Sequence, residues 1–191
     1  MRRRRLIKAP PKLAYVLLDR AQEQHAEFYR HLDHLVDKFH EDLREARIAL
    51  AYCTSWKADK DGHTTLGKCK RATDLDRELS PWDFVILLNE TFWTAHAVTV
   101  EQRLALLDHE LCHAAVRRDK DGDWKRDPKG RLLYRLRKHD LEEFRAIVER
   151  HGLWKHDLEK FAQALRRHTG QQTLELEAKP AAAEAAPART H

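Results

Sequence analysis

The sequence predicts a single α+β domain in which flanking helices pack with a small three-stranded sheet. Apolar residues recur at three- and four-residue steps in several segments, which is the spacing of amphipathic helices. Between these segments lie short apolar runs bounded by turn residues, which are typical of strands. The chain has 191 residues, which is enough for one domain with a hydrophobic core and an accessory segment.

The first helix is expected within residues 13–50. Its apolar stripe consists of Phe28, Leu32, Leu35, Val36, Phe39 and Leu43. A second helical pattern covers residues 100–116, and a third covers residues 139–150, where Gly152 supplies a stop. A last helix is expected from residue 154 to about residue 168.

Three segments in the middle of the chain are short enough to be strands. They are residues 48–56, 66–73 and 83–93, and the third reads as a buried strand. The run Asp59-Lys60-Asp61-Gly62 supplies turn residues between the first two. Residues 119–136 also carry turn signals, and we expect a loop or a hairpin there.

The two ends of the chain differ in composition from its middle. Residues 1–12 form a basic arm that contains Pro10-Pro11, a pair that breaks regular structure. Residues 169–191 end in PAAAEAAPART, which has no large apolar side chain, so we expect a disordered tail. The folded domain is therefore expected over residues 13–168.

The composition argues against a membrane or secreted protein. Charged residues make up 35% of the chain, and no apolar run approaches the ~20 residues of a membrane-spanning helix. The charged start at residues 2–5 is not followed by the apolar segment of a secretory signal. Three cysteines, Cys53, Cys69 and Cys112, are too few for a disulfide framework. We therefore expect a cytoplasmic protein.

Positive charge is concentrated in two segments. Residues 1–20 carry seven Lys and Arg against one Asp, and residues 117–138 carry ten against four Asp. Clustered positive charge attracts nucleic acid, although a solvated basic surface explains it equally well. A basic nucleic-acid-associated protein, with a structural or absent metal site, is therefore the alternative function.

The segment HELCH carries the chemistry of the chain. His109 and His113 lie one turn apart on the expected helix and project from the same face, where two imidazoles can bind one Zn²⁺ ion. Glu110 follows the first histidine and can lie beside a metal-bound water as a general base. The position of the motif within an apolar helical segment favours a site over two solvent-facing histidines.

A zinc hydrolase needs a third protein ligand and one open position for water. The first candidate is His139, which comes 26 residues after His113 and would begin the next helix. Glu143 is the second candidate and Glu142 the third, because carboxylates also bind zinc. Asp140 or Asp108 can orient a ligand imidazole from outside the metal centre, although an ordinary surface acid explains either residue equally well.

These segments resemble the putative phage metallopeptidase family, which is itself similar to the SprT-like zinc metallopeptidases. The resemblance rests on HELCH, on DFVILLNETFW before it and on KHDLEEFRAIVERHG after it. It implies a minimal zincin-like fold in which a third histidine opens a helix downstream of the metal helix. By position, the resemblance assigns His109, His113 and His139 to the metal and Glu110 to catalysis.

The predicted function is a zinc-dependent metallopeptidase that hydrolyses peptide bonds through a zinc-activated water, with Glu110 as the general base. The expected partner is a protein or peptide substrate, which would be aligned on an edge strand such as residues 83–93. Binding to a membrane is not expected. Nucleic acid is a further expected partner through residues 1–12 and 117–138.

Overall fold

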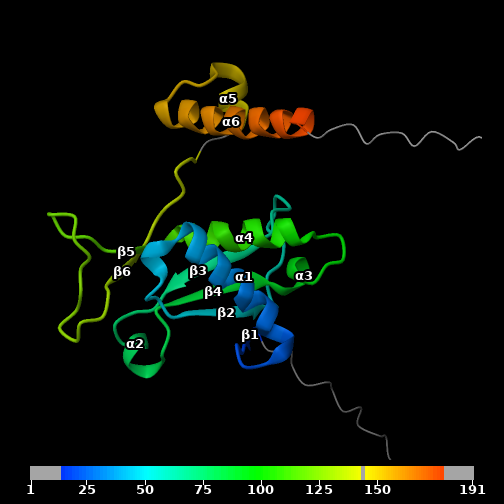
Figure 1. Ribbon diagram of the computed structural model, residues 1–191. Helices are drawn as coiled ribbons and strands as arrows, with labels where there is room; N and C mark the ends of the chain where they lie inside the picture. Colours follow the sequence, from blue (N-terminus) through cyan, green and yellow to red (C-terminus); the bar gives the residue numbers. More distant parts are fainter. Residues whose placement is uncertain (1–13, 143–144, 179–191) are drawn as a thin grey trace, which may run out of the picture. The chain divides into compact units, whose positions relative to one another are not determined.

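The computed structural model describes residues 14–142 and 145–178 (Figure 1). The basic arm at residues 1–12 and the candidate ligand Glu143 lie outside the described residues. The chain divides after Lys138 into two compact units, and each unit is described by itself.

Four strands of the first unit form a mixed sheet in the order β1-β2-β4-β3. They are β1 (Tyr15–Leu18), β2 (Ile48–Cys53), β3 (Gly67–Arg71) and β4 (Phe84–Asn89). Strands β2 and β4 run parallel, whereas β1 pairs with β2 and β3 pairs with β4 in the antiparallel sense. Strands β1 and β3 are therefore the edges of this sheet, and β4 is internal.

Two helices cover one face of this sheet, and the hydrophobic core lies beneath them (Figure 1). They are α1 (Glu23–Phe39) and α4 (Val100–His113). Each helix turns an apolar stripe toward the sheet, because burial of apolar side chains is the main favourable term in folding. The core includes Tyr29, Leu32 and Leu35 of α1, Leu107 and Leu111 of α4, and Leu50, Phe84, Ile86 and Leu88 of the sheet.

A second, two-stranded sheet follows α4. It consists of β5 (Ala114–Val116) and β6 (Tyr134–Leu136), which pair in the antiparallel sense. The segment between them contains two turns of the same design, in which an Asp side-chain oxygen accepts two backbone N–H groups and a Gly adopts a positive φ. The pairs are Asp119 with Gly122 at 93°, and Asp127 with Gly130 at 78°.

Short helical segments connect the main elements of the first unit: η1 (Glu41–Leu43), α2 (Asp76–Leu79) and α3 (Glu90–Trp93). The second unit contains α5 (Arg145–His151) and α6 (His156–Ala178). Gly152 follows α5 with a φ of 65°, which confirms its role as a helix stop. Among the described residues, no helix combines the length and the apolar character that crossing a bilayer requires.

The α+β class is confirmed, but the prediction of a three-stranded sheet is wrong. Residues 15–18, which were assigned to the first helix, form β1 and add a fourth strand beside β2. A short apolar run carries no periodicity that separates a strand from a helix, so long-range pairing decided its conformation.

Three helix boundaries also differ from the prediction. Helix α4 ends at His113 instead of residue 116, because Ala114 takes an extended backbone conformation and begins β5. The helix expected over residues 139–150 begins only at Arg145, so His139 lies in the connecting segment and not at a helix start. Helix α6 continues to Ala178, and residues 169–178 of the expected tail are therefore helical.

Candidate metal centre

Helix α4 holds the H-E-x-x-H motif in a fixed frame. At its start, Thr99 and Gln102 form a reciprocal capping box, in which each side chain accepts the backbone N–H of the other at 3.2 and 2.9 Å. At its end, Leu107 and Leu111 are fully buried in the core. Burial of this stripe fixes the rotation of the helix, so the two motif histidines are directed to a different side.

His109 and His113 lie on the same side of α4, as the spacing predicts. Their ring centroids are 5.1 Å apart and the ring planes are nearly perpendicular, at 83°. His109 is exposed and His113 is partly exposed, so solvent and ions can reach both rings. The arrangement fits two imidazoles that converge on one ion.

The backbone of Arg137 holds the ring of His113. His113 Nδ1 lies 2.8 Å from the Arg137 carbonyl oxygen, and the Arg137 N–H donates to the His113 carbonyl at 2.7 Å. A carbonyl oxygen only accepts hydrogen bonds, so Nδ1 must carry the proton in this contact. The neutral ring then presents an unprotonated Nε2, which is the form that binds a metal.

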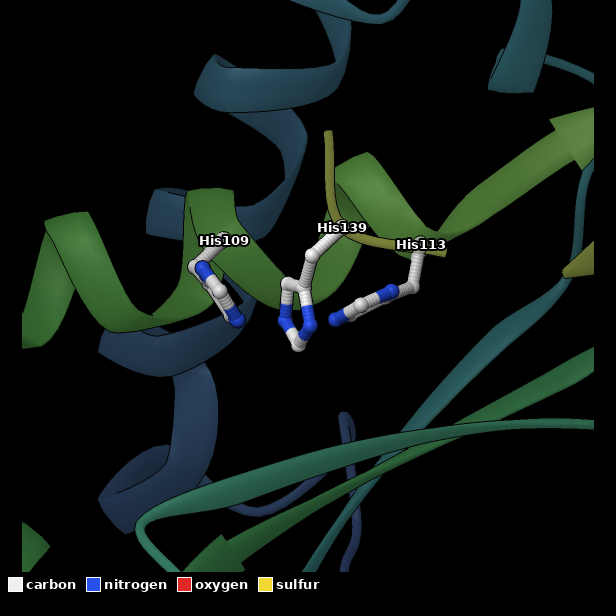
Figure 2. A group of neighbouring side chains, drawn as sticks. All are labelled: His109, His113 and His139. Atoms are coloured by element: carbon white, nitrogen blue, oxygen red, sulfur yellow. The ribbon is translucent and has the colours of Figure 1, made fainter. Parts of the chain in front are cut away.

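His139 follows Arg137 by two positions in the chain. His109, His113 and His139 each offer one ring nitrogen, and these nitrogens lie within 4.8 Å of one another. Figure 2 shows the three rings turned toward a common space. Three nitrogens bound to one tetrahedral zinc ion at about 2.0–2.1 Å would lie roughly 3.3 Å apart, so small side-chain rotations bring them into bonding range.

The other ligand candidates differ from His139. Glu142 is exposed and does not join these histidines in a group of ligand atoms within the described residues. The Oδ1 atom of Asp108 lies 2.6 Å from Nε2 of His40, which is buried. His40, Asp108 and Cys112 form a second group of candidate ligands.

Glu110 is the most buried charged side chain of the motif, with 3% of its surface exposed. It packs against Gly67 of the edge strand β3 and accepts a hydrogen bond from the backbone of Cys69. Burial raises the pKa of Glu110, while the charge of His113 and the Cys69 hydrogen bond act in the opposite direction. A carboxylate that is held dry beside a histidine is suited to accept and release a proton.

Gly67 belongs to the candidate site, although no pattern in the sequence indicates it. A Cβ at this position would lie 2.9 Å from both Cγ and Cδ of Glu110, which is closer than such atoms approach. The contact joins residues 43 positions apart. No local pattern reports a contact of this kind, so only the packing of α4 on β3 identifies Gly67.

A family model described as putative phage metallopeptidase matches residues 20–166 of this chain. The chain belongs to this family. The match of the phage metallopeptidase model includes the H-E-x-x-H motif and His139. No curated protein and no solved structure matches the chain. Membership in a metallopeptidase family implies a bound metal and a protein or peptide substrate.

Proposed function

We propose that this phage metallopeptidase is a zinc-dependent peptidase whose ion is held by His109, His113 and His139. The observation that carries the proposal is the approach of three ring nitrogens to within 4.8 Å of one another, next to a buried glutamate. Three protein ligands leave one position open, which is typical of catalytic zinc and not of structural zinc. When bound, zinc would polarise the scissile carbonyl and lower the pKa of a water molecule toward about 7.

Glu110 is proposed as the general base. It takes up the proton of the attacking water and returns that proton to the leaving amine. Two features of Glu110 support this role. It is buried next to the motif histidines, and burial raises its pKa. Gly67 supports the role indirectly by leaving room for the carboxylate.

Strand β3 is proposed to align the substrate, in place of residues 83–93. The strand within that segment, β4, is paired on both sides and offers no free edge, so the earlier expectation is wrong. Strand β3 is an edge, and the Cys69 backbone points from this edge toward Glu110. Backbone groups of alternate residues point to the same side of a strand, so Gly67 also presents its backbone there. An extended peptide added to this edge would pass the glutamate.

The test combines metal analysis with peptide cleavage. The full chain is purified, its zinc content is measured by mass spectrometry, and cleavage of an unfolded protein substrate is followed. Glu110→Gln should keep one zinc ion per chain and lose roughly 100-fold or more of the activity, since general-base catalysis contributes about 10²–10⁴. Glu101→Gln is the matched control, because it makes the same change at an exposed position of α4.

The ligands are tested by metal affinity. His113→Ala and His139→Ala should each weaken zinc binding, whereas Glu142→Ala should not. Cys112→Ser is the control for the second ligand group, which contains Cys112 but none of the three histidines. A wild-type chain without stoichiometric metal, or a Glu110→Gln variant with full activity, would overturn the proposal. If Glu142→Ala loses zinc and His139→Ala does not, the third ligand is Glu142 and not His139.

A further inference from the structure

Seven of the ten cationic residues of segment 117–138 fall into two sets with different surroundings. The first set is neutralised by acidic partners. Its ion pairs are Arg126 with Glu45 at 3.0 Å, Lys129 with Glu78 at 2.7 Å, and Arg131 with Asp127 at 2.8 Å. The first two pairs fasten the hairpin between β5 and β6 to neighbouring segments, and the third lies within the hairpin. Their positive charge is already compensated within the protein.

The second set lines a pocket, which we call the arginine pocket. Its lining consists of Arg117, Arg118, Arg135 and Arg137, together with Asp42, Ala115 and Val116. All four arginines are exposed. Asp42 is the single acidic residue of the lining, so the pocket carries a net positive charge.

Backbone carbonyls orient two of these arginines without neutralising them. Arg118 Nη1 donates to the Gly122 carbonyl at 2.8 Å, and Arg137 Nε donates to the Cys112 carbonyl at 2.8 Å. Within the described parts of the chain, no ion pair joins an arginine of the pocket to an acid. The fold therefore gathers four arginines around one pocket, where their charge is available to an external anion.

An exposed aromatic ring lies next to this pocket. Trp124 has 39% of its surface exposed and forms an isolated antiparallel bridge with Arg118. Side chains of directly opposed residues in such a bridge lie on the same face of the ribbon. A planar ring and a guanidinium group are thus presented together.

Phosphate is the anion that fits this pocket best. Guanidinium groups bind phosphate oxygens through paired hydrogen bonds, and a phosphodiester chain presents several charges in succession to several arginines. One carboxylate offers a single charge and would leave most of the four arginines uncompensated. Cationic grooves that also carry an aromatic ring bind single strands, because bases stack on the ring while phosphates follow the charge.

We propose that the arginine pocket and Trp124 bind single-stranded nucleic acid. The phosphates lie among the four guanidinium groups, and one base stacks on the indole of Trp124. The proposal does not depend on the peptidase function. Arg137 belongs to the pocket and also contacts His113, so bound nucleic acid would lie beside the candidate metal centre.

The test measures how binding of the full chain depends on salt. The probe is a labelled single-stranded DNA of mixed sequence, and its affinity is measured at a series of salt concentrations. Arg117→Ala/Arg135→Ala should reduce the slope of log affinity against log salt by about 1.4, since each lost phosphate contact accounts for about 0.7. Lys57→Ala/Lys60→Ala removes the same charge from an exposed loop and should leave the slope unchanged.

Trp124→Leu tests the stacking contact separately. It should weaken single-strand binding by roughly 5- to 150-fold and leave duplex binding and the salt slope nearly unchanged. Thermal melts of every variant confirm that the fold is kept. Three results would overturn the proposal: absence of binding at low salt, equal slopes for the pocket and control variants, or displacement of the DNA by a polyglutamate peptide at equal charge concentration. The third result would assign the pocket to acidic protein segments.

Discussion

The side chain of Glu110 occupies space that only a glycine at position 67 leaves free. A Cβ added to Gly67 would meet Cγ and Cδ of Glu110 at 2.9 Å each. Gly67 does not have a positive φ, so its role lies in the missing side chain and not in an unusual backbone conformation. The edge strand and the motif helix are thereby packed closely enough to bury the carboxylate.

Gly67→Ala should therefore displace the Glu110 carboxylate. We expect a loss of peptidase activity of roughly tenfold or more, because misplacement of a catalytic group is costly even by about 1 Å. Zinc content should stay unchanged, since the atoms nearest to the added methyl group belong to Glu110, which is not a proposed metal ligand. Cleavage and metal analysis on the same preparation check both statements.

Two further variants separate displacement from unfolding. Gly170→Ala makes the same change where nothing lies within 4 Å of the new Cβ, and its activity should equal that of the wild type. Adding Glu110→Asp to Gly67→Ala shortens the carboxylate and should recover part of the lost activity. If Gly67→Ala alone keeps full activity, the contact has no catalytic role.

Tyr29 joins two strands of the sheet through its hydroxyl group. The hydroxyl donates to the Leu18 carbonyl at 2.7 Å and accepts the Leu50 N–H at 3.2 Å. Burial raises the pKa of Tyr29, so the hydroxyl keeps its proton at neutral pH. Tyr29→Phe should lower the free energy of unfolding by about 1–3 kcal/mol, because it leaves buried backbone groups without this partner.

Urea denaturation measures this loss of stability. Tyr52→Phe is the control, since Tyr52 is partly buried in the same sheet and no hydroxyl bond to the backbone is recorded for it among the described residues. Its free energy of unfolding should change by less than about 1 kcal/mol. Equal midpoints for the two variants would show that the Tyr29 contacts do not stabilise the sheet.

Glu78 makes the stability of the first unit depend on pH in the acidic range. Hydrogen bonds from Lys129 and Arg131 lower its pKa below the ordinary 4.5. A carboxyl group whose pKa is lower in the folded chain than in the unfolded chain stabilises the fold at pH values above its ordinary pKa. This contribution is lost as the pH falls from 4.5 toward the pKa of Glu78 in the folded chain. Glu78→Gln should thus be less stable than wild type at neutral pH, with a difference that shrinks in acid.

Thermal melts at about pH 7 and about pH 3.5, at constant ionic strength, check this trend. Glu23→Gln changes an exposed glutamate at the start of α1 and is the control. If the difference in melting temperature between wild type and Glu78→Gln stays constant or grows in acid, the ion pairs of Glu78 do not cause the pH dependence.

The three cysteines should differ in their reaction with an alkylating reagent. Cys112 is exposed, whereas Cys53 and Cys69 are buried, and burial raises the pKa of Cys69 to about 12. The thiolate is the reactive form, so Cys69 reacts poorly while the chain is folded. Peptide mass spectrometry after brief alkylation should find the label on Cys112, and on all three cysteines after denaturation. Rapid labelling of Cys69 in the folded chain would mean that β3 separates from α4.

Much of the architecture could be predicted because its signals are local. The apolar stripe of α1, the apolar runs of β2 and β4 and the glycine turns each depend on residues close together in the chain. The four-residue step from His109 to His113 is equally local, since one helical turn places both rings on one side. Family membership could also be predicted, because motif and flanking segments are read directly from the sequence.

By itself, the sequence determined the α+β class, the core stripe of the motif helix and the pair of motif histidines. Only the tertiary structure decided that β1 is a strand, that β3 and not β4 forms the edge near Glu110, and that Gly67 makes room for that carboxylate. The same holds for the division of the hairpin cations into a paired set and the arginine pocket. These features arise from contacts between residues far apart in the chain. The periodicity of apolar residues indicates which face of a helix or strand is buried, but it does not indicate which other element will cover that face.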